Sequence, residues 1–274
     1  MESKWRLICS GPLKGSLNMA LDEALLEEVA AGRSEAVLRI YRWFPAAVSL
    51  GYGQRGKGAV NLEACRALGL DVVRRMTGGR AVLHHREVTY SVIAPESSSL
   101  FPGGILENYK VIAQVLQKTL ASFGIPATLA SGRRRGSGNL ESACFTAPAS
   151  YELVYRGCKM TGSAQRRQGS AFLQHGSIPV DLDLSHLYQA LNTKVGACVA
   201  EGTRRLGEKV GWMNRWLPLP VTVEAVERRL LEVFADQWRL GLREVAPSDT
   251  EMARALALQA EKYESSRWTL EGKV

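Results

Sequence analysis

Hydrophobic residues recur with helical spacing in several separated parts of the chain. This spacing covers residues 17–29, 62–68, 108–123, 222–238 and 249–263. The first of these helices is followed by Gly32, and the third by Gly124 and Pro126, which are typical residues just beyond a helix end. Asn61 precedes the second and is the expected N-cap, because its side-chain oxygen can accept a hydrogen bond from an unpaired backbone N–H.

Shorter apolar or alternating runs predict strands, which gather in the middle of the chain. They cover residues 36–41, 46–50, 72–75, 81–83, 88–93, 151–156, 159–164 and 171–178. Helices before, between and after such strands indicate an α+β fold, with a mixed β-sheet and flanking helices. We expect an N-terminal helical segment over 1–32, packed on a catalytic domain over 33–241, and a C-terminal helical tail over 242–274.

Length and composition favour one large globular domain rather than a membrane or disulfide-rich protein. The chain has 274 residues, of which 46% are hydrophobic, and its start lacks the pattern of a signal or transit peptide. No stretch approaches the ~18 uninterrupted apolar residues of a membrane span. The five cysteines are odd in number and scattered, without zinc-type spacing. We therefore expect a soluble, cytoplasmic protein with no membrane partner and no metal.

The formal net charge is +8, and much of the excess falls in short arginine clusters. These are Arg74-Arg75, Arg133-Arg134-Arg135, Arg166-Arg167, Arg204-Arg205 and Arg228-Arg229. Such a surface suits acidic proteins or other polyanions through long-range attraction. The sequence contains no helix-turn-helix, zinc-finger or basic-zipper signature and no basic segment interleaved with aromatic residues. Acidic proteins are thus the preferred interpretation, and nucleic acid is not expected as a partner.

Residues 51–56 match the GxGxxG pattern of dinucleotide-binding proteins, and Asp71 follows at about the right distance. In that fingerprint, however, the third glycine opens a long helix, whereas Gly56 is followed by further loop residues. The same segment also spells GxxxxGK, but Gly58 replaces the hydroxyl residue that magnesium requires. A glycine turn close to a ligand is the better interpretation.

The segment from Arg74 to His85 contains adjacent glycines, Gly78 and Gly79, after a predicted strand. Such a pair lets the backbone approach a ligand closely and direct N–H groups at a carbonyl or an oxyanion. A simple hairpin turn is the alternative. The flanking arginines, together with later motifs, favour the ligand-binding interpretation.

Five motifs in order resemble a known superfamily. They are residues 49–54 (SLGYGQ), 75–80 (RMTGGR), 142–148 (SACFTAP), 157–167 (GCKMTGSAQRR) and 174–178 (QHGSI). Together they resemble the biotin/lipoate ligase and transferase superfamily, and within it the cysteine-dependent octanoyltransferases, over roughly residues 17–180. The resemblance implies a biotin/lipoate-ligase type catalytic domain.

The resemblance also implies a reaction. An octanoyl group would pass from octanoyl-acyl carrier protein, through a thioester on Cys144, to a lysine of a lipoyl domain or of the glycine cleavage H protein. In this family the lysine at the position of Lys159 lies beside the reacting sulfur and lowers its pKa. A thiol titrates near pH ~8.5, so a neighbouring ammonium raises the thiolate fraction at neutral pH. Because one thioester replaces another, no cofactor is expected.

The motifs supply the remaining expected site residues. The expected substrate-binding residues are Arg75, Thr77, Gly78, Gly79, Arg80, His84, Gly162, Ser163, Ala164, His175 and Gly176. Histidines 84, 85 and 175 lie in or beside these motifs, and one of them could take a proton from the acceptor lysine. Ordering a loop by hydrogen bonding is the alternative role.

Two related activities and one further thiol remain open alternatives. ATP-dependent lipoate-protein ligases share the glycine and lysine motifs but do not depend on a cysteine at position 144. Lipoyl-domain amidotransferases use such a cysteine but take the acyl group from a protein amide. Cys158, next to Lys159, is a possible second nucleophile. Cys158, Thr161 and the pair Ala149-Ser150 depart from the family pattern and bear on acceptor choice and chain length.

Overall fold

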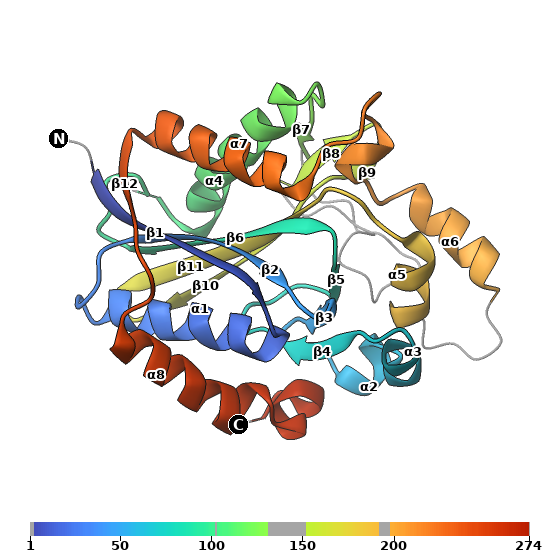
Figure 1. Cartoon of the computed structure of the whole chain (residues 1–274), viewed down its shortest axis with the longest axis horizontal. Helices are drawn as coiled ribbons and strands as arrows, with labels where there is room; N and C mark the ends of the chain where they lie inside the picture. The colour runs from blue at the N-terminus through green and yellow to red at the C-terminus, as the bar shows by residue number, and fades with distance from the viewer. Residues whose placement is uncertain (1–2, 102, 131–151, 192–197, 274) are drawn as a thin grey trace.

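A mixed β-sheet runs through the centre of the molecule (Figure 1). The computed structural model describes residues 3–101, 103–130, 152–191 and 198–273. The six-stranded sheet has the order β10-β11-β6-β2-β1-β12. Its strands are β1 (Ser3–Leu13), β2 (Val37–Trp43), β6 (Glu87–Pro95), β10 (Gly162–Gln168), β11 (Ala171–Pro179) and β12 (Leu240–Glu244). β1 is parallel to β2 and β12, and the other neighbours are antiparallel, which confirms the expected mixed sheet.

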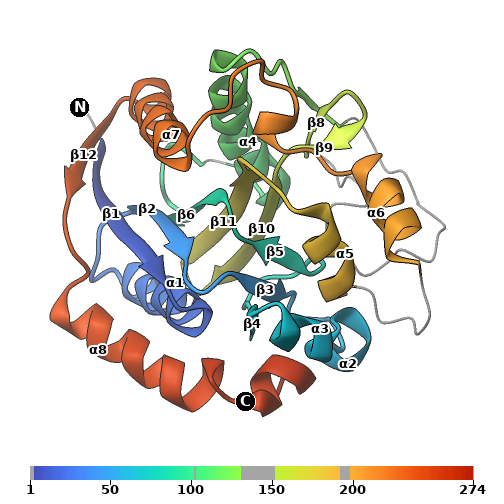
Figure 2. The same cartoon turned by 45° about the vertical axis from the view of Figure 1, so that its right-hand side comes forward.

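The alternation of side chains along the strands produces two hydrophobic layers. Leu38 and Ile40 point to one face of the sheet and Val37 and Tyr41 to the other, as a period of two requires. The first face is covered by α4 (Ile105–Ser122) and α7 (Val223–Trp238), and the second by α1 (Gly15–Ala30) and α8 (Asp249–Leu258). Figures 1 and 2 show these two helical pairs on opposite sides of the sheet. The α+β class with flanking helices is therefore confirmed.

Smaller elements complete the part of the chain that is described. One three-stranded sheet has the order β4-β3-β5, and another has the order β7-β8-β9. Their strands are β3 (Ala47–Leu50), β4 (Asp71–Arg74), β5 (Val82–His84), β7 (Thr128–Leu129), β8 (Leu153–Tyr155) and β9 (Cys158–Lys159). The short helices are α2 (Gly56–Ala59), α3 (Leu62–Ala67), α5 (Leu184–Leu191), α6 (Val199–Gly207) and the 3-10 turn η2 (Met213–Arg215). α3 has the expected cap, because the Asn61 side chain accepts a hydrogen bond of 3.0 Å from the amide of Ala64.

The first strand of the chain pairs with a strand from its C-terminal part in the central sheet. β1, which the hydrophobic pattern does not predict, lies between β2 and β12, and Ser3 pairs with Leu240. Arg6 interrupts the apolar pattern of β1, yet it is buried because its guanidinium binds both oxygens of Glu251 at 2.5 and 2.7 Å. The sheet thus takes strands from all three expected parts, 1–32, 33–241 and 242–274, with β12 lying across the second boundary. That division remains a prediction about domains.

The C-terminal segment packs along α1. Ser248 and Glu251 form a capping box at the start of α8, which continues into the π-helical turns η3 (Gln259–Tyr263) and η4 (Arg267–Glu271). Lys262 and Tyr263 both bind the Glu23 carboxylate of α1, with the Tyr263 hydroxyl 2.5 Å from one carboxylate oxygen. Of the helices described here, none has the length and apolar content needed to cross a bilayer.

Candidate active site

A pocket lies where the six-stranded sheet meets the β4-β3-β5 sheet. Many of the expected substrate-binding residues line it: Arg75, Gly79, His84, Gly162, Ser163, Ala164, His175 and Gly176. Among the described residues, the remaining expected ones, Thr77, Gly78, Arg80 and Lys159, are not part of its lining. Cys144 lies outside the described residues. The glycine motif and the two histidine-bearing strands, far apart in sequence, are thus brought together at one site.

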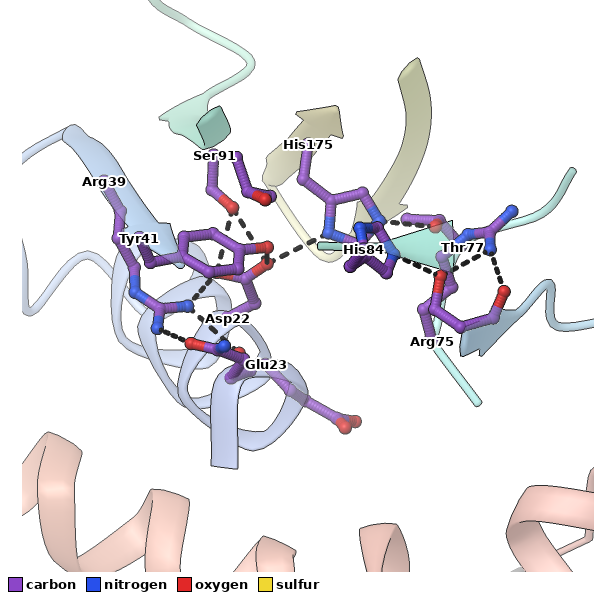
Figure 3. Close-up of polar contacts among 12 residues, drawn as sticks. Asp22, Glu23, Arg39, Tyr41, Arg75, Thr77, His84, Ser91 and His175 are labelled. Carbon is purple, nitrogen blue, oxygen red and sulfur yellow. Dashed lines mark hydrogen bonds and ion pairs between the residues drawn. The ribbon is translucent and has the colours of Figure 1, made fainter. Parts of the chain in front are cut away.

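One wall of the pocket carries a chain of hydrogen bonds through His175 (Figure 3). The ring nitrogen Nδ1 lies 3.0 Å from the carboxylate of Asp22, which α1 supplies. The other nitrogen, Nε2, lies 2.6 Å from the hydroxyl of Thr77 in the glycine turn. Asp22, His175 and Thr77 are all buried. A carboxylate, an imidazole and a hydroxyl are therefore aligned as in acid–base catalytic sites.

The charge of Asp22 is balanced from the sheet beneath it. Arg39, fully buried on β2, donates a hydrogen bond of 2.7 Å to Asp22 Oδ1, while the hydroxyls of Tyr41 and Ser91 also donate to the carboxylate. Burial raises the pKa of Asp22, but the Arg39 charge and the His175 contact outweigh this, so its pKa lies below the ordinary value. Burial lowers the pKa of His175, although Asp22 opposes the effect. At neutral pH this pair consists of a carboxylate and a neutral imidazole.

A second chain of the same kind passes through His84. Its Nδ1 lies 2.6 Å from Glu87 Oε1, and its Nε2 lies 2.7 Å from the hydroxyl of Ser49 on β3. The ring stacks on Trp43, with the ring centres 4.0 Å apart and the planes 10° from parallel. Thr89 donates to the same Glu87 oxygen at 2.7 Å. Both pocket histidines are thus fixed in position by a buried carboxylate.

Arg75 holds the glycine turn in shape. Its Nη2 donates to the carbonyl oxygens of Gly78 and Arg80, both at 2.8 Å, and its Nη1 donates to the Ser49 carbonyl oxygen at 2.9 Å. Gly79 has a φ of +94°, a conformation that residues with a Cβ rarely adopt. A Cβ at Gly51 would lie 2.8 Å from the carbonyl carbon of Gly79 and closer still to its oxygen.

The GxGxxG segment therefore serves close packing between two backbones. Gly51 faces the glycine turn, and Gly56 begins a helix of only four residues. The arrangement agrees with the glycine turn expected from the sequence. The neighbouring arginine is also committed to the fold, because the buried Arg74 donates to the carbonyls of Gly51, Tyr52 and Trp268.

Lys159 is buried on β9 and forms an ion pair with Glu152. The backbone around it is fixed, because its N–H donates to the Lys209 carbonyl at 2.8 Å. Cys158, the preceding residue, faces the other side of the strand, and its sulfur contacts the Glu208 carbonyl at 3.6 Å and the Arg215 guanidinium at 3.7 Å. Neither residue lines the described pocket.

The sequence motifs do not include the carboxylates that hold the histidines. Asp22 lies on a helix whose apolar period indicates core packing, and Glu87 begins a strand of alternating apolar residues. Two local features of the sequence could have pointed to these carboxylates. One is an acidic residue beside the buried side of α1, and the other is the H-x-x-E spacing from His84. Among the described residues, no group of three or more histidine, cysteine, aspartate or glutamate side chains could hold a metal ion.

Comparison with known proteins places the chain in a family. The model of the lipoyl protein ligase A/B catalytic domain matches residues 14–235. Octanoyltransferase LipM of Lysinibacillus sphaericus is 39% identical over 269 residues, which cover 96% of this chain and 98% of the relative. Octanoyltransferase LipM of Kyrpidia tusciae is 41% identical over 271 residues, which cover 96% of this chain and 97% of the relative. A bi-partite lipoate protein ligase of Thermoplasma acidophilum shares the fold, with a TM-score of 0.82 at 21% identity, covering 99% of this chain and 98% of that one. The chain belongs to the lipoyl protein ligase A/B catalytic domain family.

Proposed function

We propose that this protein is an octanoyltransferase of lipoate biosynthesis, which delivers an octanoyl group to a lysine of a lipoyl-accepting protein. The observation that carries the proposal is its likeness to octanoyltransferases at 34–41% identity over 96–98% of the chain. The donor is the thioester of octanoyl-acyl carrier protein. The acceptor is a lipoyl domain or the glycine cleavage H protein.

The chemistry proceeds in two steps, with Cys144 as the nucleophile. Its thiolate attacks the donor carbonyl, and the carrier thiol leaves, which stores the octanoyl group on the enzyme. The acceptor lysine then attacks this second thioester and forms the amide. Dividing the reaction in this way lets two protein substrates visit the same site in turn.

The roles of the surrounding residues follow from what they can contribute to these steps. The Lys159 ammonium stabilises the Cys144 thiolate and the developing oxyanion, and its partner Glu152 holds it in position. The backbone amides of Gly78 and Gly79 supply further oxyanion contacts, each worth about 3 kcal/mol of barrier. The residues lining the pocket beside His84 and His175 hold the acyl chain and the acceptor lysine.

An ATP-dependent lipoate-protein ligase is the alternative that the fold leaves open, because lipoate-protein ligase A bound with ATP shares it with a TM-score of 0.79 at 22% identity. The test incubates the protein with an apo lipoyl acceptor and one of three donors: octanoyl-carrier without ATP, octanoate with ATP, or an octanoylated lipoyl protein without ATP. Transfer from the carrier without ATP is expected. Transfer only from the free acid with ATP would establish a ligase. Transfer only from an octanoylated lipoyl protein would establish an amidotransferase.

A further inference from the structure

The hydrogen bonds around His175 fix which of its nitrogens carries the proton. An ionised carboxylate has only acceptor atoms, so the contact of 3.0 Å between Asp22 and Nδ1 requires the hydrogen to be on Nδ1. The Arg39 guanidinium and the hydroxyls of Tyr41 and Ser91 keep Asp22 ionised and hold it in place. The ring is therefore the Nδ1–H tautomer whenever it is neutral.

In that tautomer, Nε2 has a lone pair and accepts the hydroxyl hydrogen of Thr77 at 2.6 Å. His175 is 5% exposed and lines the pocket, and Thr77 belongs to the turn whose Gly79 also lines it. The burial that lowers the pKa of His175 keeps the imidazole uncharged near neutrality, ready to accept a proton. The charged and titratable groups that face it are Asp22, Arg75 and His84.

We propose that His175 takes up, through the Thr77 hydroxyl, a proton that the acceptor lysine must lose, and that Asp22 is the positioning residue for this step. The proposal rests on the proposed function, because it concerns the second half of that reaction. A lysine side chain is an ammonium at neutral pH and has no lone pair for attack. The pocket needs a group that removes a proton from it.

The lysine ammonium gives one proton to the Thr77 oxygen while the Thr77 hydrogen moves to His175 Nε2. The neutral amine then attacks the thioester carbonyl, a C–N bond forms and the C–S bond breaks. The sulfur leaves with the bonding electron pair and takes the second nitrogen proton, which restores the thiol. The imidazolium is stabilised by Asp22 until its proton passes to solvent.

The parallel chain through His84 is less suited to this step. Its hydroxyl, on Ser49, already accepts a hydrogen bond of 3.0 Å from the Arg75 guanidinium. A cation beside the oxygen opposes the arrival of a further proton there. The Thr77 hydroxyl is instead held by the neutral Nε2 of His175 at 2.6 Å. We therefore assign proton transfer to His175 and the holding of the pocket wall to His84.

The experiment measures the two halves of the reaction separately in Thr77→Val, which keeps the side-chain shape and removes the hydroxyl. Intact mass follows octanoyl adduct formation from octanoyl-carrier, and a rapid-quench assay follows transfer from the preformed adduct to an apo lipoyl domain. Adduct formation should stay within about threefold of the parent, whereas lysine transfer should fall about 10²-fold at neutral pH. Thr77→Ser should restore most of the rate. Thr119→Val is the matched control, since Thr119 is equally buried and bonds only within α4.

The pH profile separates a proton-transfer role from a structural one. The parent transfer rate should be nearly flat between pH 7 and 9, since His175 removes the proton. In Thr77→Val it should rise about tenfold per pH unit, because only the neutral amine fraction reacts and a lysine titrates near ~10.4. Asp22→Asn should show the same profile; if it fails to fold, Thr77→Val decides. Parent-like transfer with a flat profile in Thr77→Val would overturn the inference, whereas a parent that forms no adduct would overturn the proposed function instead.

Discussion

Gly51→Ala should distort the glycine turn of the pocket. The added Cβ would lie 2.8 Å from the carbonyl carbon of Gly79, whereas carbon atoms in contact are normally about 3.5–4.0 Å apart. The obstacle is backbone, so the turn has to move by roughly 1 Å. Such overpacking costs about 3 kcal/mol, which lowers the Tm by about 6 °C or more in a chain of this size. The same shift should slow octanoyl adduct formation about 10²-fold, because it displaces the Gly79 amide.

Gly53→Ala is the matched control for this substitution. A Cβ at Gly53 meets nothing within 4 Å, and the backbone there is compatible with alanine. It should leave the unfolding free energy unchanged or raise it by up to about 1 kcal/mol. Urea unfolding and thermal scans measure both variants, and intact mass gives the adduct rates. Equal stability and equal adduct rates in the two alanine variants would refute the argument that close backbone packing is what requires Gly51.

Three further predictions concern charged and thiol groups. Burial raises the pKa of Glu251, but the hydrogen bond from Arg6 outweighs this effect and holds the pKa below the ordinary 4.5. The ion pair therefore stabilises the fold above pH 4.5 and loses its contribution as the pH falls through the folded pKa. Glu251→Gln should flatten the acid limb when the urea midpoint is measured against pH. Cys158→Ala should keep the parent rate of adduct formation, measured by intact mass, because its sulfur faces away from Lys159. Lys159→Met should slow adduct formation at least about 10²-fold, because the ammonium that stabilises the thiolate and the oxyanion is lost. Glu152→Gln should chiefly lower the urea midpoint, because the buried Lys159 ammonium then loses the carboxylate of its ion pair.

Local periodicity was sufficient to predict most of the secondary structure. The long helices α1, α4 and α7 and the strands β6 and β11 have regular apolar spacing, and their predicted and observed bounds differ by a few residues. β1 and β12 were missed because their stability comes from pairing across the whole chain, which local spacing does not reveal. From the sequence alone, Arg6 would be expected at the surface, and its burial depends on the ion pair with Glu251.

The pocket residues could be named from the sequence where they belong to a short motif. Contacts between residues far apart in the sequence could not. The glycine turn and both pocket histidines follow from short sequence patterns. Asp22 is 153 residues from His175 in the chain, and the pairing depends on how α1 lies across β11. Lys159 is singled out by its motif and its place beside the reacting sulfur stays a prediction, whereas its pairing with Glu152 follows only from the fold.

In the proposed reaction, Cys144 carries the octanoyl group from the donor protein to the acceptor protein. Intact-mass spectrometry after mixing with octanoyl-carrier, without acceptor, tests it directly in the parent and in Cys144→Ala. We expect one octanoyl group on the parent, mapped to Cys144 by peptide analysis and discharged when apo lipoyl domain is added, and no adduct on the variant. An adduct of equal extent on Cys144→Ala, or full turnover by that variant, would contradict it.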